Sequence, residues 1–146
     1  MSYKGVFKPK NPNKYLGNPS NVIYRSRWEL KLMMYLDSHQ DVLGWASEEI
    51  AIPYKSPMDR RIHRYFVDFY VKRLVKGSVK ESLIEVKPKC QTTPPKPPKT
   101  NKPTRRFVTE VRAWGINQAK WKAAQEFCKD RGWDFLIMTE DELNIK

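Results

Sequence analysis

Two β-prone runs joined by a short turn constrain the fold of this chain more than any other feature. The first run is RYFVDFYVKRLV, residues 64–75, and the second is KESLIEVKP, residues 80–88. The residues between them, Lys76, Gly77 and Ser78, suit a hairpin turn. We therefore expect the two runs to form adjacent antiparallel strands.

Alternation along these runs brings acidic side chains to one face. Side chains two positions apart point to the same side of a strand, so Glu85 and Lys87 share a face. Opposite side chains of an antiparallel pair lie about 5 Å apart, which lets Asp68 and Glu85 share one divalent ion. A bound Mg²⁺ would also remove the repulsion between two such carboxylates. The alternative is a half-exposed hairpin in which Asp68 and Glu85 pair with Lys72 and Lys87.

Length and composition limit the number of domains and the kind of partner that this protein can have. The 146 residues suffice for one compact domain, and the hydrophobic fraction of 40% is too high for a disordered chain. Lys and Arg number 28 against 16 acidic residues, which gives a net charge of +12. Such a surface favours a polyanion, most commonly nucleic acid, with an anionic membrane or an acidic protein as alternatives.

The sequence offers no membrane segment and no cysteine framework. No apolar run approaches the roughly 18 residues of a spanning helix, and the N-terminus lacks the apolar region of a signal peptide. We therefore expect an intracellular protein with no membrane partner. Cys90 and Cys128 lack the spacing of a zinc site, so we interpret both as free thiols with no disulfide partner.

The N-terminal third predicts an arm, a helix and a strand. Residues 1–21 combine prolines and glycines with scattered lysines, which predicts an extended basic arm outside the domain formed by residues 22–146. A helix is expected over about residues 26–38, after the capping residue Ser26. A short strand should follow and end near Pro53.

The C-terminal half predicts a loop between regular elements. Residues 88–106 form a Pro/Lys-rich loop that should be extended and solvated. A helix over residues 109–132, a buried strand over residues 133–139 and a short final helix after Thr139 should follow. The order of elements predicts an α/β fold in which helices flank a mixed β-sheet.

Three sets of residues resemble known nucleases. FVDFYV followed by LIEVKP, an acid in an apolar strand and then Glu-x-Lys, resembles the metal-dependent PD-(D/E)xK nuclease superfamily. YRSRWELKLMMYLD, RIHRYFVDFYV and LIEVKP are similar to the strand-cleaving endonuclease subunit of heteromeric transposases. The opening SYKGVFKPKNPNKYLGNPSNVIYRSRWELKLMMYLD with SEEIAIPY resembles the small head-completion nucleases of T-even-type tailed phages. Val67 stands where the superfamily name has proline, which removes no metal ligand.

The resemblance implies a restriction-endonuclease-like fold and a Mg²⁺-dependent deoxyribonuclease, endo- or exonucleolytic, with Mn²⁺ as a substitute metal. It implies that Asp68, Glu85, the Val86 carbonyl and Glu29 hold one or two ions. Lys87 would then orient the attacking water or help to deprotonate it. The implied partners are double-stranded DNA and phage head, portal or neck proteins, in the host cytoplasm during assembly or in the virion.

Glu29 has two interpretations. Ser26-x-x-Glu29 is a capping box, which alone explains a glutamate at this position. Glu29 also shares a helical face with apolar residues, so it should point inward, where the resemblance makes it the upstream acid of the metal site. Glu48 and Glu49 are the substitutes for that role.

Cations after the Glu-x-Lys motif would bind the DNA backbone, which carries no sequence information, so cleavage should be weakly sequence-specific. These residues are Lys89, Lys96, Lys99, Lys102, Arg105, Arg106 and Lys120. A solvated surface or a docking strap for a protein explains them equally well. Trp114, Trp121 and Trp133 are better explained by packing in the core than by stacking on bases.

The alternative function is that of a non-catalytic virion structural protein that binds DNA or the portal and retains a nuclease fold.

Overall fold

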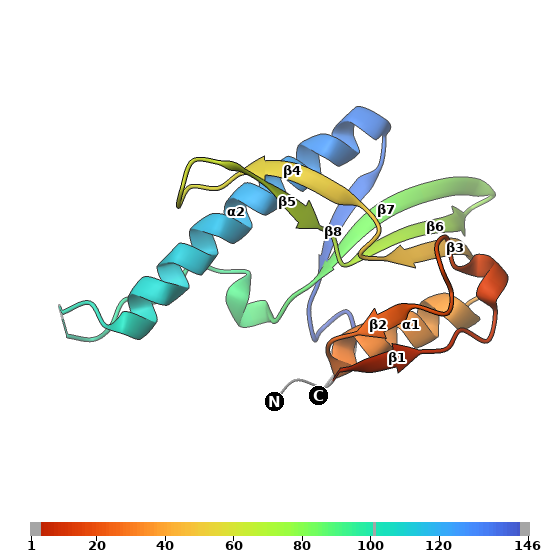
Figure 1. The fold of residues 1–146 in the computed structure, drawn as a ribbon, viewed down its shortest axis with the longest axis horizontal. Helices are drawn as coiled ribbons and strands as arrows, with labels where there is room; N and C mark the ends of the chain where they lie inside the picture. The colour runs from red at the N-terminus through yellow and green to blue at the C-terminus, as the bar shows by residue number, and fades with distance from the viewer. Residues whose placement is uncertain (1–3, 101, 144–146) are drawn as a thin grey trace.

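A four-stranded mixed β-sheet forms the centre of the computed structural model, which describes residues 4–100 and 102–143 (Figure 1). Its strands are, in spatial order, β3 (Val42–Ser47), β6 (Phe69–Val75), β7 (Ser78–Val86) and β8 (Asp134–Met138). Strand β6 is antiparallel to both β3 and β7, whereas β7 and β8 are parallel. The predicted α/β fold with a mixed sheet is therefore confirmed.

The predicted hairpin is formed by β6 and β7. Lys76 and Gly77 make its two-residue turn with φ angles of 50° and 78°, a pair of positive values that is typical of the type I′ turn. Phe69 pairs with Ile84 in the register of the hairpin. Continuing the same register places Asp68 and Glu85 opposite each other.

A helix covers each face of the sheet (Figure 1). Helix α1 (Arg27–Ser38) buries its apolar stripe against the face that carries Phe69 and Ile84. Helix α2 (Arg105–Arg131) buries Trp121, Ala124 and Cys128, and these residues pack with Leu83 and Tyr65. Because Leu83 and Ile84 point to opposite faces, each helix has its own apolar core.

The first long β-prone run is two strands rather than one. Strand β5 (Ile62–Phe66) pairs with β4 (Ala51–Lys55) in a separate two-stranded sheet, and β6 starts only after Val67 and Asp68. At the break, the Val67 N–H donates to the Ile50 carbonyl, and the Glu48 N–H donates to the Asp68 carbonyl. The prediction of one continuous strand was wrong because these long-range bonds turn the chain from one sheet to the other.

Two further strand predictions also needed correction. Residues 42–47 form β3, which the sequence did not predict as a separate strand. Pro53 lies inside β4 instead of ending it, which an edge strand tolerates because its outer side needs no N–H donor. Strand β8 is at the edge of the described sheet and is half-exposed rather than buried.

The N-terminal segment is folded onto the domain rather than extended as an arm. It contains β1 (Gly5–Phe7), the 3₁₀ turn η1 (Pro12–Lys14) and β2 (Val22–Tyr24), with β1 and β2 paired. Its buried side chains are Phe7, Tyr15 and Val22. The buried carboxylate of Asp37 in α1 accepts the N–H groups of Lys10 at 2.8 Å and Asn11 at 3.0 Å. The prediction of an extended arm was wrong because these long-range contacts and the pairing of β1 with β2 hold the segment against the domain.

Two helix predictions in the C-terminal half need correction: the start of α2 and the final helix after Thr139. Thr104 caps α2 by accepting the Phe107 N–H at 3.1 Å, so Arg105 and Arg106 belong to the helix and not to the Pro/Lys loop. Gly132 ends α2 in the left-handed region, as predicted. After Thr139 the described residues up to Leu143 form turns instead of a helix, and residues 144–146 lie outside the described part.

Within the described residues, neither helix is both long and apolar enough to cross a membrane.

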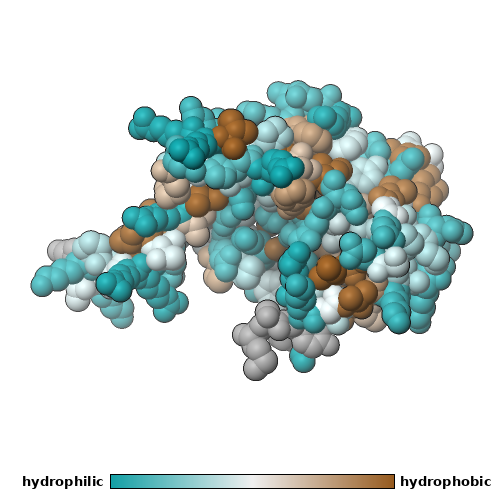
Figure 2. Space-filling model, in the orientation of Figure 1, coloured by the Kyte–Doolittle hydropathy of each residue, from teal (hydrophilic) through white to brown (hydrophobic). Residues whose placement is uncertain are grey.

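Among these residues Cys90 is an exposed free thiol and Cys128 a buried one. In the Pro/Lys-rich loop, the residues described between 88 and 104 contain one short 3₁₀ turn, η2 (Lys89–Gln91). Figure 2 shows that the loop and the N-terminal half of α2 project from the body, and that their surface is largely hydrophilic.

Candidate active site

Asp68 and Glu85 form a carboxyl pair where β6 begins and β7 ends, in which Glu85 is buried and Asp68 is half-buried. The Val86 N–H donates to Asp68 Oδ2 at 2.8 Å, and Glu85 is only 6% exposed. Burial and, after it, the charge of Glu85 and a hydrogen bond with Glu85 raise the pKa of Asp68 to about 9. The pair therefore holds a proton at neutral pH when no cation is present.

Two donors fix the carboxylate of Glu85. The Tyr65 hydroxyl donates to Glu85 Oε2 at 2.7 Å, and Trp121 Nε1 donates to the same oxygen at 3.1 Å. Burial and the neighbouring Glu85 charge raise the pKa of Tyr65, which keeps the phenol a donor. Because both donors use Oε2, they fix the rotation of the carboxylate and leave Oε1 for Asp68 or a cation.

The donor set of this pair fits a divalent ion of the Mg²⁺ type. No group of three or more His, Cys, Asp or Glu side chains in the described part of the chain is arranged to hold a metal. Mg²⁺ needs only one or two protein carboxylates, since waters and phosphate oxygens complete its octahedron. A cation in place of the shared proton would offset the repulsion that contributes to the raised pKa of Asp68.

Glu29 caps the N-terminus of α1. Its N–H donates to Ser26 Oγ at 3.1 Å, and the Ser26 hydroxyl is 3.3 Å from Glu29 Oε2, so the predicted cap is confirmed. Burial and then the charge of Glu48 raise the pKa of Glu29. The charge of Glu29 is in turn among the causes that raise the pKa of Asp68, so the two carboxyl groups interact. A role for Glu29 as a metal ligand stays a prediction.

Arg25 is a cation near these acids that the sequence interpretation did not single out. Its Nε lies 3.0 Å from Glu48 Oε1, and its pKa is raised by Glu48 and, to a smaller extent, by Glu29 and Asp68. The Glu48 N–H donates to the Asp68 carbonyl at 3.1 Å, while Glu49 Oε1 lies 3.4 Å from the Tyr15 hydroxyl. Neither substitute acid joins the carboxyl pair.

Lys87 follows the pair on the same side of the strand. Its N–H donates to the Met138 carbonyl at 2.9 Å, so the parallel pairing of β7 with β8 continues for one residue beyond Val86. The alternation of the strand then puts the half-buried Lys87 on the face of Glu85. A role for the Lys87 ammonium beside an ion held by the pair stays a prediction.

Comparison with known proteins identifies the family. The family model described as TnsA-like endonuclease N terminal matches residues 39–140, which is more than half of the chain. The chain belongs to this TnsA-like endonuclease family. The head completion nuclease of Enterobacteria phage T4 is 41% identical over 145 residues, which cover 98% of this chain and 95% of that protein.

The region matched by the TnsA-like endonuclease family contains Asp68, Glu85 and Lys87, whereas Glu29 precedes it. The resemblance to nucleases that the sequence indicated is thus confirmed. Tyr65 and Trp121 also lie within the matched region. The sequence interpretation assigned Trp121 to packing and did not single out Tyr65 as a site residue. A buried glutamate signals that some donor must be near, but only the fold determines which donor.

The predicted DNA contacts lie in two places on this TnsA-like domain. Lys120 Nζ lies 5.5 Å from the centre of the Tyr65 ring, beside the carboxyl pair. Lys89 Nζ is paired with Asp141 at 3.0 Å, and Arg106 with Glu110 at 2.9 Å. The remaining predicted cations are exposed on the projecting loop and on the first turn of α2: Lys96, Lys99, Lys102 and Arg105.

The raised pKa of Asp68 predicts how the stability of the metal-free protein changes with pH. Stability from the protonated carboxyl is fully present below the unfolded pKa of about 3.9 and is lost as pH rises through the folded value of about 9. In the presence of a chelator we therefore expect the melting temperature to fall from pH 5 to pH 9. Thermal melts of Asp68→Asn should show a weaker fall, and identical pH profiles for both proteins would contradict the raised pKa.

Proposed function

We propose that this chain is a Mg²⁺-dependent deoxyribonuclease of little sequence specificity that acts in the completion of phage heads. The observation that carries the proposal is the pairing of half-buried Asp68 with buried Glu85, with Lys87 on the same face of the strand, in a member of an endonuclease family. The role in head completion is supported by the name of the T4 relative. Mn²⁺ should replace Mg²⁺, because it accepts the same oxygen ligands.

In this proposal Asp68 and Glu85, with the Val86 carbonyl, would hold the ion, and Tyr65 and Trp121 would keep the Glu85 carboxylate oriented. Bound there, Mg²⁺ would supply Lewis-acid polarisation of the scissile phosphate. The Lys87 ammonium would orient the attacking water and offset the negative charge that develops on the phosphorus centre. The Arg25 guanidinium would stabilise the acids around the site when DNA is absent.

The proposed substrate is double-stranded DNA, and the proposed partners are head, portal or neck proteins in the host cytoplasm. A net charge of +12 favours binding to the phosphate backbone, which carries no sequence information. Lys120 would contact DNA beside the carboxyl pair, and the cations of the projecting loop would contact it further away. These contacts would position the substrate without reading its bases.

Neutralising the loop lysines should weaken the salt dependence of DNA binding. Each phosphate contact that is lost flattens the slope of log affinity against log salt by about 0.9 on duplex DNA. We expect this change when Lys96, Lys99 and Lys102 are together replaced by Ala, with turnover preserved at saturating DNA and low salt. Titration of labelled duplex into metal-free protein measures the slope.

A matched control for this triple variant removes three exposed lysines elsewhere, namely Lys76, Lys80 and Lys129. Both triple variants lower the net charge equally, so only contacts made by the loop distinguish them. Equal slopes for the two variants would contradict a DNA-binding role of the loop and favour a protein partner for it.

Glu29→Gln should distinguish a cap from a metal ligand. An amide can still accept a hydrogen bond from the backbone, so the melting temperature should stay within a few degrees of the wild-type value. If Glu29 helps to hold the ion, cleavage should fall by roughly tenfold or more. Cleavage assays and thermal melts of the same preparation make this test, and full activity would reduce Glu29 to a capping residue.

Incubation with supercoiled plasmid tests the proposed function itself. We expect Mg²⁺ to support nicking or linearisation and a chelator to abolish it. Attack on closed circles would identify an endonuclease, whereas attack on linear duplex alone would identify an exonuclease. DNA binding without any cleavage in Mg²⁺ or Mn²⁺ would contradict the proposal and favour a non-catalytic DNA- or portal-binding protein.

A further inference from the structure

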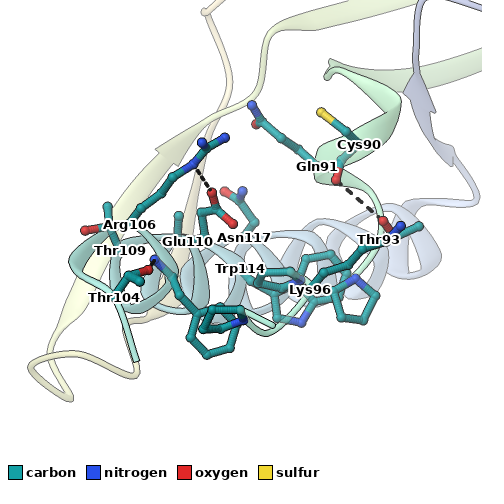
Figure 3. A pocket seen from close by; sticks show the side chains of 15 residues that line it. Cys90, Gln91, Thr93, Lys96, Thr104, Arg106, Thr109, Glu110, Trp114 and Asn117 are labelled. Carbon is teal, nitrogen blue, oxygen red and sulfur yellow. Dashed lines mark hydrogen bonds and ion pairs between the residues drawn. The ribbon is translucent and has the colours of Figure 1, made fainter. Parts of the chain in front are cut away.

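A pocket of about 830 Å³ lies between the Pro/Lys loop and the N-terminal half of α2, outside the carboxyl pair (Figure 3). This volume falls within the range of about 300–1,000 Å³ that is typical of small-molecule sites. We call the surrounding region, residues 88–100 and 102–114, the loop–helix arm. The buried side chains of α2 all come from its second half, so the arm projects beyond the core of the domain.

The lining of the pocket combines flat apolar groups with amides. Phe107 and Trp114 from α2 are half-buried, and several prolines of the loop, Pro94, Pro95 and Pro98, also line the pocket. Gln91 from the loop and Asn117 from α2 bring side-chain amides to the lining, and Figure 3 labels both. Aromatic faces stack on nucleobases, and amides can hydrogen-bond to base edges.

The charge around the pocket favours an anionic ligand. Lys96 and Arg106 line it, and Glu110 is the acid among the lining residues. Arg106 is bound to Glu110 at 2.9 Å, but the Arg106 side chain is 90% exposed. An exposed ion pair of this kind contributes little to stability, so a phosphate group could take the place of Glu110.

The position of the pocket connects it to the proposed cleavage site. Gln91 is four residues after Lys87, so their Cα atoms are at most about 14 Å apart. A DNA strand that passes Lys87 would therefore reach the pocket within a few nucleotides. A base of a duplex can enter a pocket only after it is unstacked and unpaired, which costs a few kcal/mol, whereas an unpaired base enters at lower cost.

We propose that this pocket binds an unpaired nucleotide of the DNA substrate, at an overhanging end or a single-stranded branch next to the cleaved bond. Phe107 and Trp114 would stack on the base, and Arg106 would bind the phosphate after release from Glu110. This inference rests on the proposed function, because it takes DNA as the substrate.

Binding to a labelled duplex with a blunt end and to the same duplex with a short overhang tests the inference in chelator. Stacking of one base predicts that wild-type protein prefers the overhang by about fivefold to a hundredfold. Phe107→Ala should bring this ratio close to one, and Glu110→Gln should increase it by freeing Arg106. Tyr35→Ala removes an exposed aromatic ring from α1 and should leave the ratio unchanged. Melting temperatures verify that each variant is folded.

Equal affinity of wild-type protein for both DNAs, or the same preference in Phe107→Ala, would overturn the inference. An unchanged ratio in Glu110→Gln would also contradict the role given to Arg106. Failure of the proposed function has a different signature: no cleavage in Mg²⁺ or Mn²⁺, with the overhang preference still present in chelator and still lost in Phe107→Ala. Normal cleavage without any overhang preference would overturn the pocket assignment alone.

Discussion

Asp68→Asn or Glu85→Gln should abolish Mg²⁺-dependent DNA cleavage, with a loss of roughly a thousandfold or more. The expected loss is this large because each change removes one of the two carboxylate charges of the pair, and several kcal/mol of metal-dependent stabilisation depend on that charge. Single-turnover cleavage of plasmid DNA at saturating Mg²⁺ measures the effect. Asp130→Asn, which neutralises an exposed acid at the far end of α2, is the control and should keep full activity.

The same two variants should retain their fold. Both amides keep an oxygen that can accept the existing bonds, from Val86 to residue 68 and from Tyr65 and Trp121 to residue 85. An amide also removes the need for the pair to take up a proton on folding, so the melting temperature in chelator should be unchanged or slightly higher. A clear decrease would instead favour carboxylates that are stabilised by ion pairs with lysines.

Lys87→Ala should lower turnover by about a hundredfold to a thousandfold while metal affinity stays close to wild type. The ammonium group cannot be a metal ligand, so its contribution is confined to the water and to the charge of the transition state. Parallel measurements of turnover at saturating DNA and of Mn²⁺ affinity separate these effects. A variant that loses metal binding together with turnover would show that Lys87 organises the pair itself.

The central hairpin and the facing acids were predictable because they depend on local rules. Strand alternation and a two-residue turn at Lys76 and Gly77 fix which side chains face each other, and the structure follows this register. Asp68 itself lies between two strands rather than inside one. The break depends on bonds from residues 48 and 50, whose positions no pattern within the β-prone run reveals.

The donors to Glu85 could not be predicted for a related reason. Tyr65 is 20 positions from Glu85 in the sequence, and Trp121 is 36 positions away. Each has the burial expected of a core aromatic residue, so composition gives no sign of the polar contact. The folding of the N-terminal segment onto the domain was not predicted either. The Lys10 N–H donates to Asp37 on α1, 27 positions away, and no local pattern connects these two residues.

Titration of Mn²⁺ followed by electron paramagnetic resonance tests most directly the central claim that Asp68 and Glu85 together hold the divalent ion. Free Mn²⁺ gives the signal, so binding is measured without DNA and independently of cleavage. We predict that wild-type protein binds the ion and that Asp68→Asn and Glu85→Gln each weaken binding by more than about tenfold. Equal affinity in all three proteins would contradict the account.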